Sequence, residues 1–184
     1  MSLLYGFATN FKLSAWLQSI KNMLPAGISG FSAMSSAVAL PLTIMAAEKN
    51  TKNKEITNFV VPSTVNFHLV GDCIAIPIFA MAIMVSFGYA VPSITDYAMF
   101  VLFFVIAKFG VAAIPGGGIL VMWPVLANQL GFTSDMLSFI HALYVMFDCI
   151  ITSVNVMGNG AFAMLFTKAY KQTAKLQLTS SEYN

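Results

Sequence analysis

The chain has 184 residues, of which 58% are hydrophobic and 9% are charged, whereas about a quarter of the residues in a soluble domain are charged. This composition and the charge-free runs over residues 26–47 and 109–134 exclude a soluble globular protein and predict an integral membrane protein. The net charge of +2 comes from nine lysines and seven acidic residues, and the chain has no arginine. We expect no nucleic-acid partner, because no basic surface is available to neutralise a phosphate backbone.

The first predicted element is a helical hairpin over residues 12–47. Its apolar sequence is interrupted at residues 27–30 and again at 34–36. Lysines lie at both ends, which favours a hairpin that enters the membrane from the cytoplasm and returns there. At the second interruption, Ser35 and Ser36 can offer hydroxyl and backbone N–H groups to an anionic ligand at the N-terminus of a half-helix.

A transmembrane helix is predicted over the next apolar run, residues 59–90. It carries four residues of interest: Asn66, His68, Gly71 and Asp72. His68 and Asp72 are four positions apart and would touch on one helix face, which suggests a proton relay. Alternatively, these two side chains only satisfy each other in a packed interior. Gly71 suggests local unwinding, which exposes carbonyl groups that can hold a cation.

A second hairpin is predicted over residues 97–130. The sequence Ile-Pro-Gly-Gly-Gly divides it into 97–113 and 119–130. A helix over the second segment, at about 1.5 Å per residue, covers only about 18 Å of a membrane core about 30 Å thick, so this element is expected to turn back. Gly116, Gly117 and Gly118 permit a tight reversal and close approach of the backbone to a ligand, although a mere loop would have the same sequence.

The last predicted element is a transmembrane helix over residues 136–167. Its polar residues follow helical spacing: Asp148, Thr152, Asn155 and Asn159. This spacing places all four on one face of an apolar helix. An ionised carboxylate in mid-membrane is costly, so Asp148 is expected to face a cavity or meet a cation. The alternative is a structural hydrogen bond between neighbouring helices.

Lysine positions predict how these elements cross the membrane. Lysines cluster near residues 12–21, 49–54 and 168–175, and the positive-inside rule places these three regions in the cytoplasm. The loops 91–96 and 131–135 are then expected outside. The predicted fold is an all-α membrane protein with two re-entrant helical hairpins and two transmembrane helices in an inverted repeat. Broken helices in two inverted halves indicate a transporter whose binding site lies at the membrane midplane.

The two predicted transmembrane helices share a short pattern, Val-Asn followed by Gly and a polar residue, at 65–72 and 154–159. We therefore expect one transport core over residues 1–175 and a cytoplasmic tail over 176–184. The protein is expected to cross the cell (inner) membrane several times, with the lipid bilayer as a partner.

In this order, the features resemble the transport core of the dicarboxylate/amino acid:cation symporter family, the glutamate transporter-like proteins. The resemblance covers roughly residues 12–175 and rests on three motifs: Ser35-Ser36 followed by Leu40-Pro41, Ala113-Ile114-Pro115-Gly116-Gly117-Gly118, and Asp148 through Asn155-Val156-Met157-Gly158. Family members carry preceding helices that form a trimeric scaffold. The resemblance therefore implies the C-terminal part of such a transporter, with scaffold helices or a homo-trimer as partners.

The resemblance also implies roles for individual residues. Asp148 would hold the amino group of the substrate, Thr152 and Asn155 would orient its carboxylate, and the second hairpin would act as the gate. The family's basic residue for an acidic substrate side chain would fall at Ile151 or Met34, and neither is basic.

The cation motif of the family is altered in this chain. Within it, Asn66 is kept and His68 stands where the family has a carboxylate; Asn159 replaces the family's terminal aspartate. Asn66, His68, Gly71, Asp72, Asn155 and Asn159 are the candidates for binding a coupling cation or proton. A site with fewer carboxylates binds sodium more weakly. Because His68 and Asp72 can exchange protons, protons are expected to contribute to coupling.

Two hypotheses follow for the function. The first is a secondary-active symporter core that moves an amino acid or dicarboxylate with Na⁺ or H⁺, with no other cofactor and no metal beyond a Na⁺ site. The alternative is a non-transporting remnant or one half of a split membrane complex. An enzyme is not expected, because no Ser or Cys stands in a recognisable nucleophile motif beside His68 or His141.

Overall fold

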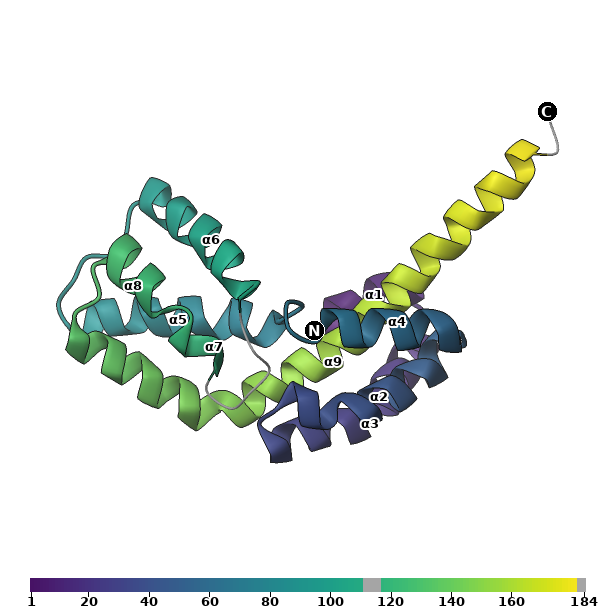
Figure 1. Ribbon diagram of the computed structural model, residues 1–184, viewed down its shortest axis with the longest axis horizontal. Helices are drawn as coiled ribbons and strands as arrows, with labels where there is room; N and C mark the ends of the chain where they lie inside the picture. The colour runs from purple at the N-terminus through teal and green to yellow at the C-terminus, as the bar shows by residue number, and fades with distance from the viewer. Residues whose placement is uncertain (111–116, 182–184) are drawn as a thin grey trace.

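The computed structural model describes residues 1–110 and 117–181, with side chains up to residue 174. These residues form helices and contain no strand, which confirms the all-α prediction for the described part of the chain. The helices are α1 (Ser2–Thr9), α2 (Leu13–Ala33), α3 (Ser36–Thr51), α4 (Lys54–Thr64), α5 (Val70–Ser86), α6 (Ile94–Lys108), α7 (Gly117–Leu120), α8 (Trp123–Leu130) and α9 (Ser134–Ser181). Helix α9 runs through the molecule, with α5, α7 and α8 along its N-terminal half and α1 to α4 along its C-terminal half, while α6 packs on α8 (Figure 1).

Helices α2 and α3 form an antiparallel pair joined by a tight break. Met34 takes a left-handed conformation (φ 48°), and Ser35 is extended, with its hydroxyl accepting a hydrogen bond from the Val38 N–H. At the far ends of the pair, the Asn50 amide donates to the Ser19 carbonyl over 2.9 Å. Only one of the two predicted interruptions is a break, since α2 continues through residues 27–30. There the small residues let α2 lie close to α9.

The single helix predicted over residues 59–90 is wrong, because the structure has two helices, α4 and α5, separated at residues 65–69. The residue before α5, Leu69, has no side-chain cap. Instead, the Gly71 N–H, which lies in the first turn and has no acceptor within the helix, donates to Asn155 Oδ1 of α9 over 2.7 Å. A tertiary contact therefore satisfies the start of α5, and the unwinding lies just before Gly71 rather than at it.

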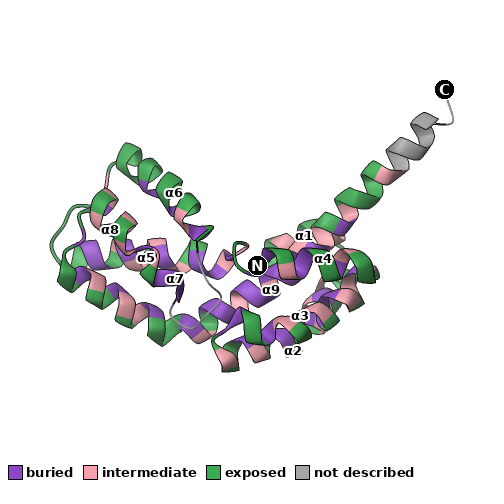
Figure 2. Cartoon of the chain, viewed as in Figure 1, coloured by how far each residue is buried: buried purple, intermediate pink, exposed green. Residues whose placement is uncertain are grey.

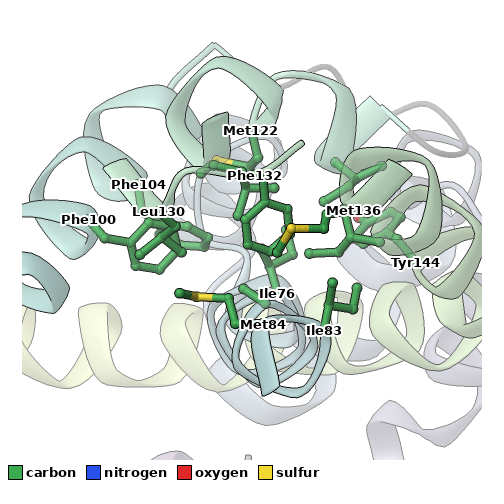
Figure 3. Packing of buried hydrophobic residues seen from close by; sticks show 14 of the residues in the cluster. Ile76, Ile83, Met84, Phe100, Phe104, Met122, Leu130, Phe132, Met136 and Tyr144 are labelled. Atoms are coloured by element: carbon green, nitrogen blue, oxygen red, sulfur yellow. The ribbon is translucent and has the colours of Figure 1, made fainter. Parts of the chain in front are cut away.

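The segment predicted as the second hairpin contains α6, α7 and α8. Residues 111–116, and with them Gly116 and the centre of the predicted break, lie outside the described residues. Helix α8 begins with Pro124 in its first turn and ends at Gly131, which has a positive φ of 68°. Phe100 and Phe104 of α6, Met122 of the turn between α7 and α8, and Leu130 of α8 pack with Ile76 of α5 and Met136 of α9 in one apolar cluster (Figure 3).

A second apolar cluster lies on the other half of α9. It joins Tyr5, Met23 and Val61 from the N-terminal helices to Val156 of α9. The first cluster reaches Ile151, so the two clusters approach each other at the middle of α9. Buried residues dominate this stretch of the helix (Figure 2).

Helix α9 contains the helix predicted over residues 136–167. Its part Ser134–Ala174 is the one helix, among those in the described residues, that is long and apolar enough to cross a membrane. Val70–Ser86 and Gly117–Leu130 are shorter apolar stretches.

Candidate functional site

A polar stripe is buried on one side of α9. The side chains of Asp148, Thr152, Asn155 and Asn159 are each at most 5% exposed. The Thr152 hydroxyl donates to Asp148 Oδ1 over 3.1 Å. The helical spacing of these residues therefore directs four polar groups into the interior, as the sequence predicts, and Tyr144, one turn before Asp148, is buried as well.

Asp72 of α5 is the centre of a buried hydrogen-bond network. Its Oδ1 accepts from Lys108 Nζ over 2.8 Å and from the Tyr144 hydroxyl over 2.7 Å, and its Oδ2 accepts from Asn155 Nδ2 over 2.6 Å. Asp72 is 1% exposed and Lys108 is 4% exposed. A charge at this depth is tolerated when an opposite charge and further hydrogen bonds surround it. The network ties α5, α6 and α9 together.

The Lys108 ammonium group also reaches α7. Nζ donates to the Gly118 carbonyl over 3.1 Å and lies 5.4 Å from the centre of the Phe104 ring. Gly118 is required for this approach, because a Cβ at its position would lie 2.6 Å from Asp72 Oδ1 and would overlap the Tyr144 hydroxyl. The glycine therefore lets the backbone of α7 lie directly on the network.

Asn155 connects the network to the break before α5. One end of its amide accepts from the Gly71 N–H and the other donates to Asp72. A Cβ at Gly71 would overlap the backbone carbonyl of Ile151. Gly71 is thus needed for close contact between α5 and α9, and not only for unwinding.

The α2–α3 pair approaches the same part of α9. A Cβ on Gly30 would lie 3.4 Å from the Thr152 carbonyl oxygen and 2.9 Å from the Val156 side chain. Ser35 and Ser36, about one helical turn beyond Gly30, are both buried. The second predicted hairpin, α6 to α8, reaches α9 at Tyr144 through α7, and we refer to it below as the second helix pair. Both helix pairs therefore reach α9 between Tyr144 and Val156.

The predicted pair of His68 and Asp72 does not form. His68 lies before α5, in the non-helical segment, so the two residues do not share a helix face. The His68 ring packs instead on Phe162, with ring centroids 4.7 Å apart. Its Nδ1 and Asn159 Oδ1 are buried atoms without a hydrogen-bond partner. Asn66 is exposed in the same segment.

Two members of the network, Lys108 and Tyr144, are absent from the predicted site. Lys108 is the single lysine outside the three lysine clusters, and an ionisable residue inside an apolar run is by itself a signal of function. Tyr144 lies four residues before Asp148, so the same helical spacing that identifies the polar stripe extends to it.

Comparison with known proteins identifies the family. The sequence matches the sodium:dicarboxylate symporter family over residues 1–169. The chain belongs to this family. The family is one of symporters rather than enzymes, which confirms both the resemblance and the expectation that the protein is not an enzyme.

Curated relatives in the sodium:dicarboxylate symporter family differ in the substrates and ions that their names give. The chain is 29% identical to a proton/sodium-glutamate symport protein of Geobacillus stearothermophilus over 77% of its own length and 33% of the relative. It is 30% identical to a proton/glutamate-aspartate symporter of Escherichia coli over 85% of its length and 35% of the relative. A serine/threonine transporter of Acinetobacter baylyi is 24% identical over 84% of the chain and 38% of the relative. The chain therefore spans about a third of the length of these relatives.

Proposed function

We propose that this chain is the transport core of a secondary-active symporter that moves an amino acid or dicarboxylate together with Na⁺ or H⁺. The observation that carries the proposal is the buried polar stripe of α9, at the place where both helix pairs approach it. A carboxylate 4% exposed within an apolar helix, such as Asp148, is costly in a membrane unless it serves a ligand or a partner.

In this proposal the substrate binds beside α9. Asp148 pairs with the ammonium group of an amino acid, and Thr152 assists in orienting its carboxylate. Asn155 uses its amide oxygen and one N–H on α5, which leaves a second N–H for the substrate. Ser35 and Ser36 cover one side, and Gly117 and Gly118 cover the other as part of the gate.

We propose that α2–α3 and α6–α8 are re-entrant hairpins of an inverted repeat. Support comes from their positions along α9. The end of the α2–α3 pair that is away from its turn, here called the open end, lies beside residues 164–172 of α9. There Asn50 and Thr51 line a surface pocket with Lys168. The open end of the second pair packs with the start of α9 through Leu130, Phe132 and Met136. The two pairs therefore open toward opposite ends of α9.

We propose that this core lies in a membrane and packs against scaffold helices. These helices belong to other segments, or the core forms a homo-trimer. Large apolar side chains are exposed on α6 and at its end, including Ile94, Ile106 and Phe109, and much of this helix faces outward (Figure 2). Such a surface is stable in lipid or against apolar helices. The proposed location is the cell (inner) membrane, with several crossings.

Coupling is proposed to involve the segment before α5. Buried, unpartnered atoms of His68 and Asn159 can exchange a proton or contribute to a cation site together with Asn66 and the backbone around Gly71. An imidazole nitrogen can accept a proton and release it again.

Uptake into liposomes tests both transport and coupling. With the chain reconstituted, labelled glutamate, aspartate or serine is expected to accumulate when either an inward pH gradient or an inward Na⁺ gradient is imposed. His68→Ala is expected to abolish the response to the pH gradient, because it removes the imidazole of the segment before α5 that the proposal uses as the proton acceptor.

The matched control for this experiment is His141→Ala, which removes the other histidine of the chain, stacked on Trp123. It should leave the pH response in place. Uptake that needs Na⁺ and ignores pH would contradict the proton role of His68, and no uptake under any gradient would favour the remnant or split-complex alternative.

The topology is tested by cysteine labelling from outside the cell. In a background with Cys73→Ala and Cys149→Ala, Ser93→Cys is expected to react with an impermeant maleimide and Lys52→Cys only after permeabilisation, because lysine-rich loops stay in the cytoplasm. External labelling at position 52 would contradict the proposed orientation.

A further inference from the structure

Lys108 is a cation built into the chain and held by oxygen atoms of two other elements. Its ammonium group contacts the Asp72 carboxylate at 2.8 Å and the Gly118 carbonyl at 3.1 Å. Carboxylate and carbonyl oxygens are also the ligands that hard metal cations prefer. A lysine ammonium is a compact point charge, so it can fill a position that a monovalent metal ion would otherwise fill.

The charges around this position balance without a mobile ion. Among the described residues, Asp72 and Cys73 of α5 lie near Lys108, Tyr144 of α9 shares the Asp72 carboxylate with it, and Asp148 lies near Tyr144. Asp72 is paired with Lys108, and its remaining hydrogen bonds come from the neutral Tyr144 and Asn155. Asp148 lies one turn further along α9, where the proposed function places the substrate ammonium. Among the described residues, no three His, Cys, Asp or Glu side chains group together as metal ligands.

We propose that Lys108 is a tethered cation that takes the place of a coupling Na⁺ between α5 and α7. The ammonium group joins the Asp72 carboxylate to the Gly118 backbone, and so holds the second helix pair against α9 without bound sodium at this position. The consequence for transport rests on the proposed function, whereas the tethered cation itself is a property of the folded chain. Because Lys108 is covalently part of the chain, the cation at this position does not dissociate during the transport cycle. Coupling then depends on ions that bind elsewhere.

The experiment removes the tether and asks whether Na⁺ replaces it. Lys108→Ala leaves the Asp72 carboxylate without its cation and frees the volume of the side chain. Breaking a buried pair is expected to lower the Tm in nanodiscs by on the order of 10 °C in choline chloride. If Na⁺ then binds with a Kd of about 1 mM, about 100 mM NaCl raises the Tm of the variant by about 5–10 °C, and raises that of the unmodified chain by much less.

Fluorescence gives a second measurement at the relevant helix. The chain has two tryptophans, and Trp16→Phe leaves Trp123 of α8 as the single reporter. In Lys108→Ala, Trp123 emission is expected to shift on release of α7 and to return with Na⁺ but not with choline.

The control is the double variant Lys108→Ala with Asp72→Asn, which removes both charges. It should fold and show no Na⁺ response at this position. If Lys108→Ala folds in neither salt while the double variant folds, the unpaired carboxylate is the cause of the defect, but Na⁺ does not replace the ammonium group and the proposal is overturned. Failure of both variants to fold would overturn the proposal, because the defect would then not be one of charge.

The inference is also overturned if Na⁺ raises the Tm of the unmodified chain as much as that of Lys108→Ala, or if Lys108→Ala shows no response to Na⁺. These results are independent of uptake. A chain that shows the expected Na⁺ pattern and no transport would keep the tethered cation and refute the proposed function.

Discussion

Asp148→Asn is expected to abolish amino-acid binding while the fold remains intact. Asparagine has nearly the same shape and keeps an oxygen that can accept the Thr152 hydroxyl, which now donates to Asp148 Oδ1 over 3.1 Å. What it loses is the charge that, in the proposed function, pairs with the substrate ammonium. Removing one partner of a desolvated charge pair costs about 2–5 kcal/mol, which weakens binding by about 30-fold to several thousand-fold. Isothermal titration with glutamate, aspartate and serine measures this loss.

Asp135→Asn is the matched control, because Asp135 is an exposed carboxylate in the first turn of the same helix. It should bind as the unmodified chain does, and both variants should have a similar Tm. If Asp148→Asn instead raises the Tm and binding persists, Asp148 is a buried charge without a ligand role. That result would remove the central residue from the proposed substrate site.

Local sequence patterns were sufficient to predict α9 and its polar stripe. The helix is long, and residues 148, 152, 155 and 159 repeat with helical spacing, so a local periodicity carries the information. The break between α2 and α3 is similarly local, since the serine at 35 caps the next helix with its own side chain.

Long-range contacts explain what the sequence did not predict. Residues 59–90 have a continuous apolar pattern, and the start of α5 is determined by the Gly71 N–H binding Asn155, 84 positions away. His68 and Asp72 have the spacing of a helical pair, but the helix begins between them. Lys108 contacts Asp72, 36 positions away, and a periodic pattern in one sequence does not link residues so far apart. Predictions from periodicity thus located the helices better than the partners of their polar residues.

Gly118→Ala is expected to displace α7 from the network and to abolish uptake. The added methyl group would lie 2.6 Å from Asp72 Oδ1 and would overlap the Tyr144 hydroxyl. Neither neighbour can move freely, because Tyr144 donates to Asp72, which also accepts from Lys108. Overpacking of this kind costs about 1–3 kcal/mol, which corresponds to a Tm lower by about 2–12 °C in a chain of this size. Thermal unfolding and liposome uptake measure the two effects.

Gly110→Ala is the matched control for this substitution. Gly110 follows α6 in the same segment, its φ is not in the left-handed region, and the nearest atom to an added Cβ is the Ala107 carbonyl oxygen at 3.4 Å. It should therefore change the Tm by less than about 2 °C, since exposed substitutions away from such contacts stay within about 0.5 kcal/mol. Equal effects of the two substitutions would show that the segment is sensitive to any alanine. Loss of uptake with Gly118→Ala alone means that the proposed gate depends on the close approach of the α7 backbone to Asp72 and Lys108, because of these two substitutions only Gly118→Ala brings a methyl group against the buried ion pair.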